Sequence, residues 1–189
     1  MISKPACPPN YREDYASPFS LLSQYDIILF DTCSLIHEGC ERFLLNCCRN
    51  VRAVLCVPEI VLDELERLGH SSKSCRFRAA IVLEEITALI RVGFLHVLPA
   101  ANERDRHGHA DGYFLRLAAQ NMFSCRARIL VLTDDTGLAE DLTTLKRISS
   151  GSSFDVMHLS NGFPVAYDND SGMMPKTHKH ISRKGLRYA

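Results

Sequence analysis

The chain has 189 residues, of which 46% are hydrophobic and 23% are charged, so it is long and apolar enough to bury the core of one domain. Its formal net charge is zero, so only the distribution of charge can indicate a charged partner. No stretch approaches the ~18 apolar residues that span a bilayer, and no signal peptide is visible, so we expect a cytoplasmic protein with no membrane partner.

The eight cysteines predict a reduced protein and not a disulfide framework. Cys56 lies inside an apolar run, and the sequence contains no Cys-x-x-Cys pair. Cys33, Cys40 and Cys47 are seven residues apart, a spacing that indicates packing and not zinc binding. We therefore expect most cysteines to be small buried hydrophobic residues.

The first half of the chain begins with an arm and then alternates strands with helices. Residues 1–24 contain four prolines and predict an extended arm. The continuous apolar run at 26–31 is typical of a strand covered on both faces. A helix over about 38–48 and a second strand over about 52–57 follow.

Two helices come next. Pro58 opens the first, at a position where a missing N–H costs little, and Gly69 ends it. The second is expected over about 72–91, because apolar residues recur there at helical spacing. Gly93 stops this helix, and 94–98 predicts a third strand.

The second half continues the alternation after a polar loop at 100–110. A helix over about 110–122 is followed by a strand at 128–133, a helix at 136–147 and a strand at 154–159. This order predicts an α/β fold with three layers, in which helices cover both faces of a central, mainly parallel sheet of about five strands.

We place this domain at residues 25–160. Residues 161–189 are expected to form an irregular C-terminal tail, which is basic and lacks acidic residues from Lys176 onwards.

Acidic residues follow two of the predicted strands. Asp31 ends the first strand, and Asp134 and Asp135 follow the fourth. Sites in parallel sheets form beyond the carboxyl ends of the strands, so these side chains converge if the two strands are neighbours. Glu64 and Asp111, each in a helix that follows a strand, can join them.

Such a cluster of carboxylates predicts a metal site. Two negative charges about 4 Å apart repel by roughly 4 kcal/mol at an effective dielectric near 20, so the group either holds protons or holds a cation. Oxygen ligands suit Mg²⁺ or Mn²⁺ better than Zn²⁺. Because such ions activate water and stabilise charge on phosphate oxygens, hydrolysis of phosphodiester bonds fits this chemistry.

Four short motifs surround these acids in order along the chain. They are Asp31-Thr-Cys-Ser34, Val57-Pro-Glu-Ile-Val-Leu-Asp-Glu-Leu65, Asp111-Gly-Tyr-Phe-Leu-Arg-Leu-Ala118 and Leu130-Val-Leu-Thr-Asp-Asp135. Over residues 25–160 the ordered set resembles the PIN-domain family of nucleases. Cys33 departs from the family pattern, in which Asn or Ser is common at that position.

The resemblance implies a PIN-like fold and an endoribonuclease that cleaves single-stranded RNA with Mg²⁺ or Mn²⁺. A metal-activated water would attack, leaving a 5′-phosphate. Thr133 and Ser34 would orient carboxylates or water. The acids that the resemblance marks as catalytic and metal-binding are Asp31, Glu64, Asp111 and Asp135, and it marks Asp134 as a further metal ligand.

Each acid also has a simpler interpretation. Asp31 would cap the following turn, and Asp134 or Asp135 would cap the helix that starts at 136. Asp111 would interact only with its helix dipole. Glu64 would lie on a solvated helix face, where neighbouring acids compete with it.

Two basic segments are candidates for binding the RNA backbone, although each is also typical of a solvated surface. One surrounds a predicted helix start and the other is the C-terminal tail. Their residues are Arg67, Lys73, Arg76, Arg78, Lys176, Lys179, Arg183 and Lys184.

Other functions remain open from the sequence. A haloacid dehalogenase-type phosphatase would need an acid where Cys33 stands. A catalytically weak or inactive PIN-like scaffold that binds RNA or protein would lack one of the acids, whereas all four positions are filled. A toxin of a toxin–antitoxin pair, inhibited by a protein partner, is an alternative, and a homodimer or an adaptor protein is compatible with either activity.

Overall fold

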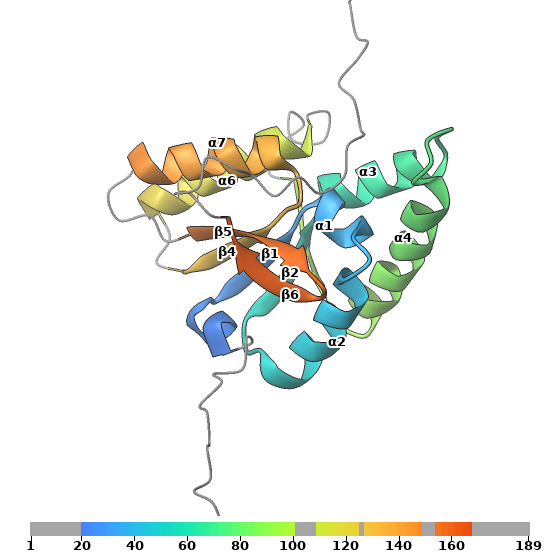
Figure 1. The fold of residues 1–189 in the computed structure, drawn as a ribbon, viewed down its shortest axis with the longest axis horizontal. Helices are drawn as coiled ribbons and strands as arrows, with labels where there is room; N and C mark the ends of the chain where they lie inside the picture. The colour runs from blue at the N-terminus through green and yellow to red at the C-terminus, as the bar shows by residue number, and fades with distance from the viewer. Residues whose placement is uncertain (1–19, 101–108, 125–126, 149–153, 168–189) are drawn as a thin grey trace, which may run out of the picture.

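A six-stranded sheet in the order β3-β2-β1-β4-β5-β6 forms the centre of the molecule. The computed structural model describes residues 20–100, 109–124, 127–148 and 154–167 (Figure 1). The strands are β1 (Ile27–Phe30), β2 (Val54–Pro58), β3 (His96–Leu98), β4 (Ile129–Leu132), β5 (Phe154–Ser160) and β6 (Phe163–Ala166). All neighbouring pairs are parallel except β5 and β6, which are antiparallel.

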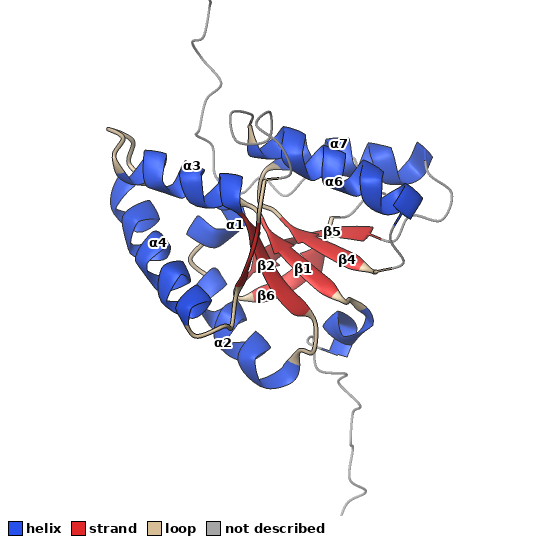
Figure 2. Cartoon of the chain, turned by 180° about the vertical axis from the view of Figure 1, so that it is seen from behind, coloured by secondary structure: helices blue, strands red, loops and turns tan. Residues whose placement is uncertain are grey.

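Helices cover both faces of this sheet (Figure 2). One side carries α6 (Ala110–Ser124) and α7 (Thr136–Ile148), and the other carries α1 (Thr32–Ile36), α2 (Cys40–Asn50), α3 (Glu59–Gly69) and α4 (Arg76–Arg91). A short 3₁₀ helix, η1 (Ser20–Gln24), precedes β1. The predicted α/β/α architecture with a mainly parallel sheet is confirmed, with six strands in place of about five.

The central strands explain why the sequence gives this fold. All four residues of β4 are buried, and so are three of the four in β1. Both strands lie in the middle of the sheet under helices on each side, so a polar residue on either face would lose its water. Cys40, Cys47 and Cys56 are buried in the same core, as predicted.

The structured part extends past both predicted domain limits. The expected extended arm at 1–24 is wrong for 20–24, which form η1, and Leu22 there is fully buried. The expected irregular tail is wrong for 163–166, which form β6. Residues 1–19 and 168–189 lie outside the described residues.

A tight hairpin joins β5 to β6. Ser160 pairs with Phe163, which leaves the two-residue turn Asn161-Gly162, and both turn residues have positive φ angles of 52° and 81°. This turn matches the right-handed twist of the strands, and Asn-Gly is its preferred sequence. The turn packs so closely on the start of α2 that a Cβ added at Gly39 would lie 2.6 Å from the Gly162 nitrogen.

None of the helices in the described ranges combines the length and the apolarity needed to cross a bilayer.

A polar contact ties the amino ends of the strands together, far from the edge where the acids stand. The Tyr25 hydroxyl donates to Asp155 Oδ2 at 2.6 Å, and Lys146 of α7 forms an ion pair with the same carboxylate. Burial acts to raise the pKa of Asp155, but the hydrogen bonds from Lys146 and Tyr25 outweigh it and lower this pKa. The contact therefore links the start of β1 to β5 and α7.

We expect Tyr25→Phe to lower the free energy of unfolding by about 1 kcal/mol, because the Asp155 carboxylate loses one hydrogen-bond donor. Urea unfolding at pH 7 measures this change. An unchanged free energy of unfolding would show that solvent replaces the hydroxyl without cost.

Candidate active site

The strand order reverses between β1 and β4. From β1 the chain moves to β2 and β3 on one side, and from β4 it moves to β5 on the other. In open parallel sheets, ligands bind beyond the carboxyl ends of the strands at such a switch point. Phe30 pairs with Leu132 there, so Asp31 and Thr133 leave the sheet side by side. The Asp31 amide donates to the Leu132 carbonyl at 3.0 Å.

Asp31 is a buried carboxylate. Its residue is 3% exposed, and it makes no side-chain capping bond to α1, so the simpler capping role does not describe it. Thr133 donates a hydrogen bond to its Oδ2 at 2.9 Å. Burial, with a smaller effect from the charges of Glu64 and Asp111, raises its pKa to about 7 despite that hydrogen bond. The Asp31 carboxylate is therefore stable at this position only with a bound proton or a nearby cation.

Glu64 is the acid of α3 that faces Asp31. Thr32, the residue after Asp31, donates from its hydroxyl to Glu64 Oε2 at 2.8 Å. Asp63 and Glu66 are exposed. Glu59 accepts the Ala100 amide at 3.0 Å. A solvated-face role therefore fits Asp63 and Glu66 better than Glu64.

Asp135 has two sets of contacts. Its Oδ1 accepts the amides of Gly137 at 2.7 Å and Leu138 at 3.1 Å, so it caps α7. Its own amide donates to the Thr133 hydroxyl at 3.0 Å. Because the same hydroxyl holds Asp31, the carboxyl ends of β1 and β4 share one hydrogen-bond network.

Asp134 is oriented toward β5. Its Oδ1 accepts the Leu159 amide at 3.3 Å, and its Oδ2 is buried without a hydrogen-bond partner. Burial raises its pKa, while the imidazoles of His37 and His158 act in the opposite direction. Asp134 is thus an incompletely satisfied carboxylate at this edge of the sheet.

Asp111 lies in the first turn of α6 and is partly buried. Its charge acts to raise the pKa of Asp31, so the two carboxyl groups lie within electrostatic range of each other.

The Cys33 thiol lies within electrostatic range of four of the acids. Desolvation and the charges of Asp31, Asp135, Glu64 and Asp134 all raise its pKa, so the thiol stays protonated at neutral pH. A protonated thiol is a poor nucleophile and a poor metal ligand. Cys33 is exposed to solvent beside these acids and adds no charge to them.

Two further residues support the site without having been predicted. One is Thr32, whose hydroxyl donates a hydrogen bond to Glu64. The other is Tyr167, whose hydroxyl donates to the Thr133 carbonyl at 2.6 Å and whose ring lies 5.1 Å from that of His158. Desolvation and then the charge of Asp134 raise the pKa of Tyr167. Thr32 follows Asp31 directly in the first motif. For Tyr167 the available sequence signal is the Asn161-Gly162 turn, because a hairpin there brings the residues after β6 back to the sheet.

Ser34 contacts backbone and not a carboxylate. Its hydroxyl, fully buried, donates to the Asp31 carbonyl at 2.8 Å. It therefore fixes the start of α1, whereas its predicted contact was with a carboxylate or water.

The predicted basic segment divides into two groups. Arg67, Lys73 and Arg76 are exposed. Arg78 is turned inward, where its Nε donates to the Ile36 carbonyl at 3.4 Å. The tail residues Lys176, Lys179, Arg183 and Lys184 lie outside the described residues.

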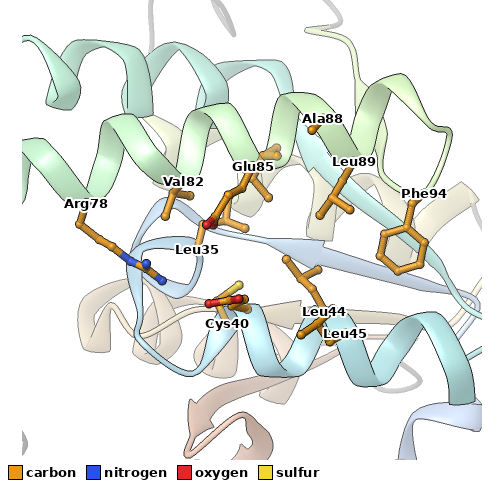
Figure 3. Close-up of a pocket in the computed structure, with 12 residues that line it drawn as sticks. Leu35, Cys40, Leu44, Leu45, Arg78, Val82, Glu85, Ala88, Leu89 and Phe94 are labelled. Carbon is orange, nitrogen blue, oxygen red and sulfur yellow. The ribbon is translucent and has the colours of Figure 1, made fainter.

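A cavity of about 290 Å³ lies between α2 and α4. Figure 3 shows Leu44 and Leu45 of α2 facing Leu89 of α4, with Phe94 at one end and Arg78 at the other. None of the predicted catalytic acids lines it. The carboxylate cluster, and not this apolar cavity, therefore has the groups needed for chemistry.

The donor chemistry of the cluster fits a hard divalent cation. Its side chains offer carboxylate oxygens, and the burial of Asp31 and of the Asp134 Oδ2 atom carries a cost that a cation would offset. Within the described ranges, no group of three or more His, Cys, Asp or Glu side chains is placed so that it could hold a metal ion. Mg²⁺ does not need such a group, because it keeps several waters and binds one or two carboxylates directly.

Known proteins give distant likenesses only. No family model matches the chain, and no curated protein matches it. A solved structure of the PIN domain endonuclease Utp24 is 20% identical with a TM-score of 0.48, and the match covers 73% of this chain and 88% of that one. A domain of a functionally unknown protein from Methanocaldococcus jannaschii is 15% identical with a TM-score of 0.49, covering 71% and 93%. At these TM-scores neither likeness bears on activity.

Proposed function

We propose that this protein is a nuclease that hydrolyses phosphodiester bonds with Mg²⁺ or Mn²⁺, and that single-stranded RNA is its substrate. The observation that carries the proposal is the buried Asp31 carboxylate at the switch point of the sheet, close to the charges of Glu64 and Asp111. That arrangement is costly unless a proton or a cation compensates it. The RNA substrate and a cytoplasmic location rest on the sequence alone.

Asp31 and Asp135 would hold the ion, with Glu64 and Asp111 as the remaining acids around it. A bound divalent ion supplies an activated water and stabilises charge on the phosphate. Thr133 fixes the Asp31 carboxylate and the Asp135 backbone through one hydroxyl, and Thr32 fixes Glu64. These hydrogen bonds hold the acids in place before the substrate arrives, which lowers the reorganisation required in the transition state.

Cleavage of a 5′-labelled single-stranded RNA tests the proposal. We expect cleavage in Mn²⁺, none in EDTA, and recovery when Mn²⁺ is added back. Products with a 5′-phosphate are expected from attack by water. A parallel reaction on DNA of the same sequence tests the RNA preference, and absence of cleavage of either strand with Mg²⁺ and Mn²⁺ would contradict the proposed activity.

Asp135 allows its structural and chemical roles to be separated. Asn caps helices about as well as Asp, so Asp135→Asn is expected to change the free energy of unfolding by less than about 0.5 kcal/mol. The same change removes a negative charge from the cluster and is expected to slow cleavage by about 10²-fold.

Asp135→Ala is the matched variant, and its lost cap should cost about 1 kcal/mol in addition. Urea unfolding and initial cleavage rates measure the two effects. Wild-type cleavage by Asp135→Asn would restrict Asp135 to the capping role.

A further inference from the structure

A large aromatic side chain is exposed at the turn between α3 and α4. Phe77 is 70% exposed, and the Arg76 guanidinium lies over its ring at 4.5 Å from the centroid. Figure 1 and Figure 2 both show this turn at the outer edge of the molecule, away from the sheet. An exposed phenylalanine has no role in the core, and the arginine contacts one face of its ring.

The charge around Phe77 is uniformly positive along the chain. From Arg67 to Arg78 the sequence contains four Arg or Lys residues and no Asp or Glu. Arg67, His70, Lys73 and Arg76 are all exposed. Since Arg78 is turned inward to the Ile36 carbonyl, the exposed cations at this turn are Arg67, Lys73 and Arg76. A polyanion is the partner that this charge would attract.

The two helices pack against each other at this turn, and α3 joins the turn to the candidate active site. A Cβ added at Gly69 would meet Ala80 at 3.6 Å, so the two helices pack closely where the hairpin opens. Arg67 is three residues after Glu64 in α3, and residues at that spacing lie on the same face of a helix. Arg67 therefore lies one helical turn from Glu64, and Lys73, Arg76 and Phe77 follow it along the chain.

We propose that the turn between α3 and α4 binds single-stranded nucleic acid, with one base stacked on Phe77 and phosphates held by Arg67, Lys73 and Arg76. The proposal deepens the proposed function, since it gives the strand a path away from the acids. Aromatic stacking accepts any base, so this contact recognises an unpaired strand without reading its sequence. A duplex, whose bases are already stacked, would gain less from Phe77.

A protein partner is the rival occupant, because Ile81 is 50% exposed and lies one turn after Phe77 on α4. A contact with protein would use the apolar surface of both residues. Three exposed cations without an acid between them favour the polyanion.

Binding in EDTA tests the proposal without cleavage. Fluorescence anisotropy with a labelled single-stranded RNA should show a Kd about tenfold weaker for Phe77→Ala and for Phe77→Leu, which keeps the apolar surface but loses the ring. Phe77→Tyr should bind like the wild type. Val92→Ala is the matched control, because Val92 is 76% exposed at the opposite end of α4, and it should have no effect. Lys73→Ala should reduce the salt dependence of binding by about one ion.

Unchanged RNA affinity in Phe77→Ala would overturn the proposal, and so would wild-type affinity in Phe77→Leu. If the alanine variant keeps its RNA affinity but loses self-association in sedimentation velocity, the turn is a protein contact instead. A wild type that binds RNA through Phe77 but does not cleave it with Mn²⁺ would contradict the proposed function and leave this surface intact. Since Phe77 lies outside the core, thermal unfolding of each variant should match that of the wild type.

Discussion

Replacement of Asp31 by Asn is expected to lower the rate of metal-dependent RNA cleavage by at least about 10³-fold. Loss of a group that only supports a metal ligand already costs 10- to 100-fold, and Asp31 is the carboxylate at the centre of the cluster. The change keeps the size of the side chain and an oxygen to accept from Thr133, so the fold should persist. Initial rates on labelled RNA in Mn²⁺ measure the loss.

Asp63→Asn provides the matched control for this experiment. Asp63 precedes Glu64 in α3 and is exposed, so its loss removes the same charge from the protein without touching the cluster. It should cleave at nearly the wild-type rate. Equal cleavage rates for Asp31→Asn and the wild type would show that Asp31 has no role in the reaction.

The second large effect is a loss of stability of the metal-free protein as the pH rises. The pKa of Asp31 is about 7 in the folded protein, against 3.8 in the reference state. A folded-state pKa above the unfolded one means that the folded protein binds the Asp31 proton more tightly. Below pH 3.8 this proton therefore makes its full contribution to the free energy of unfolding. This contribution is lost between pH 3.8 and about 7, and amounts to roughly 4 kcal/mol.

Thermal unfolding in EDTA at pH 5 and pH 8 measures this effect. We expect the wild type to unfold several degrees lower at pH 8, and Asp31→Asn to reduce that difference, because it removes the titrating group. Asp134, whose pKa is also raised, contributes in the same direction and remains in the variant. Mn²⁺ at pH 8 should raise the unfolding temperature of the wild type. The same pH dependence in Asp31→Asn would show that other groups cause it.

The central strands of the fold could be predicted from short-range patterns in the sequence. The apolar runs at 26–31 and 128–133 predicted strands buried on both faces, and they are the neighbouring strands β1 and β4. The acids that follow them converge because parallel strands end at the same edge. The motif resemblance singled out Glu64 among the acids of its helix, but helical spacing does not tell which acid meets Thr32, and the structure supplies that contact.

Other features depend on contacts that no local pattern encodes. The orientation of Asp134 toward Leu159, and that of Asp135 toward the α7 amides, is set by how β4, β5 and α7 pack. The contact of Tyr167 with Thr133 spans 34 residues and requires β6 to fold back. The sequence Asn161-Gly162 is typical of a hairpin turn, but the Gly, Pro, Asp and Ser residues of this segment led to the prediction of an irregular tail instead. Pro164 is tolerated within β6 because β6 is an edge strand.

Titration of the metal-free protein with Mn²⁺, followed by calorimetry at pH 8, tests most directly whether these carboxylates form a cation site. The wild type should bind Mn²⁺, Mg²⁺ should compete for the same site, and Asp31→Asn should bind at least about tenfold more weakly. Wild-type protein that takes up no Mn²⁺, or a variant that binds it with undiminished affinity, would contradict the assignment.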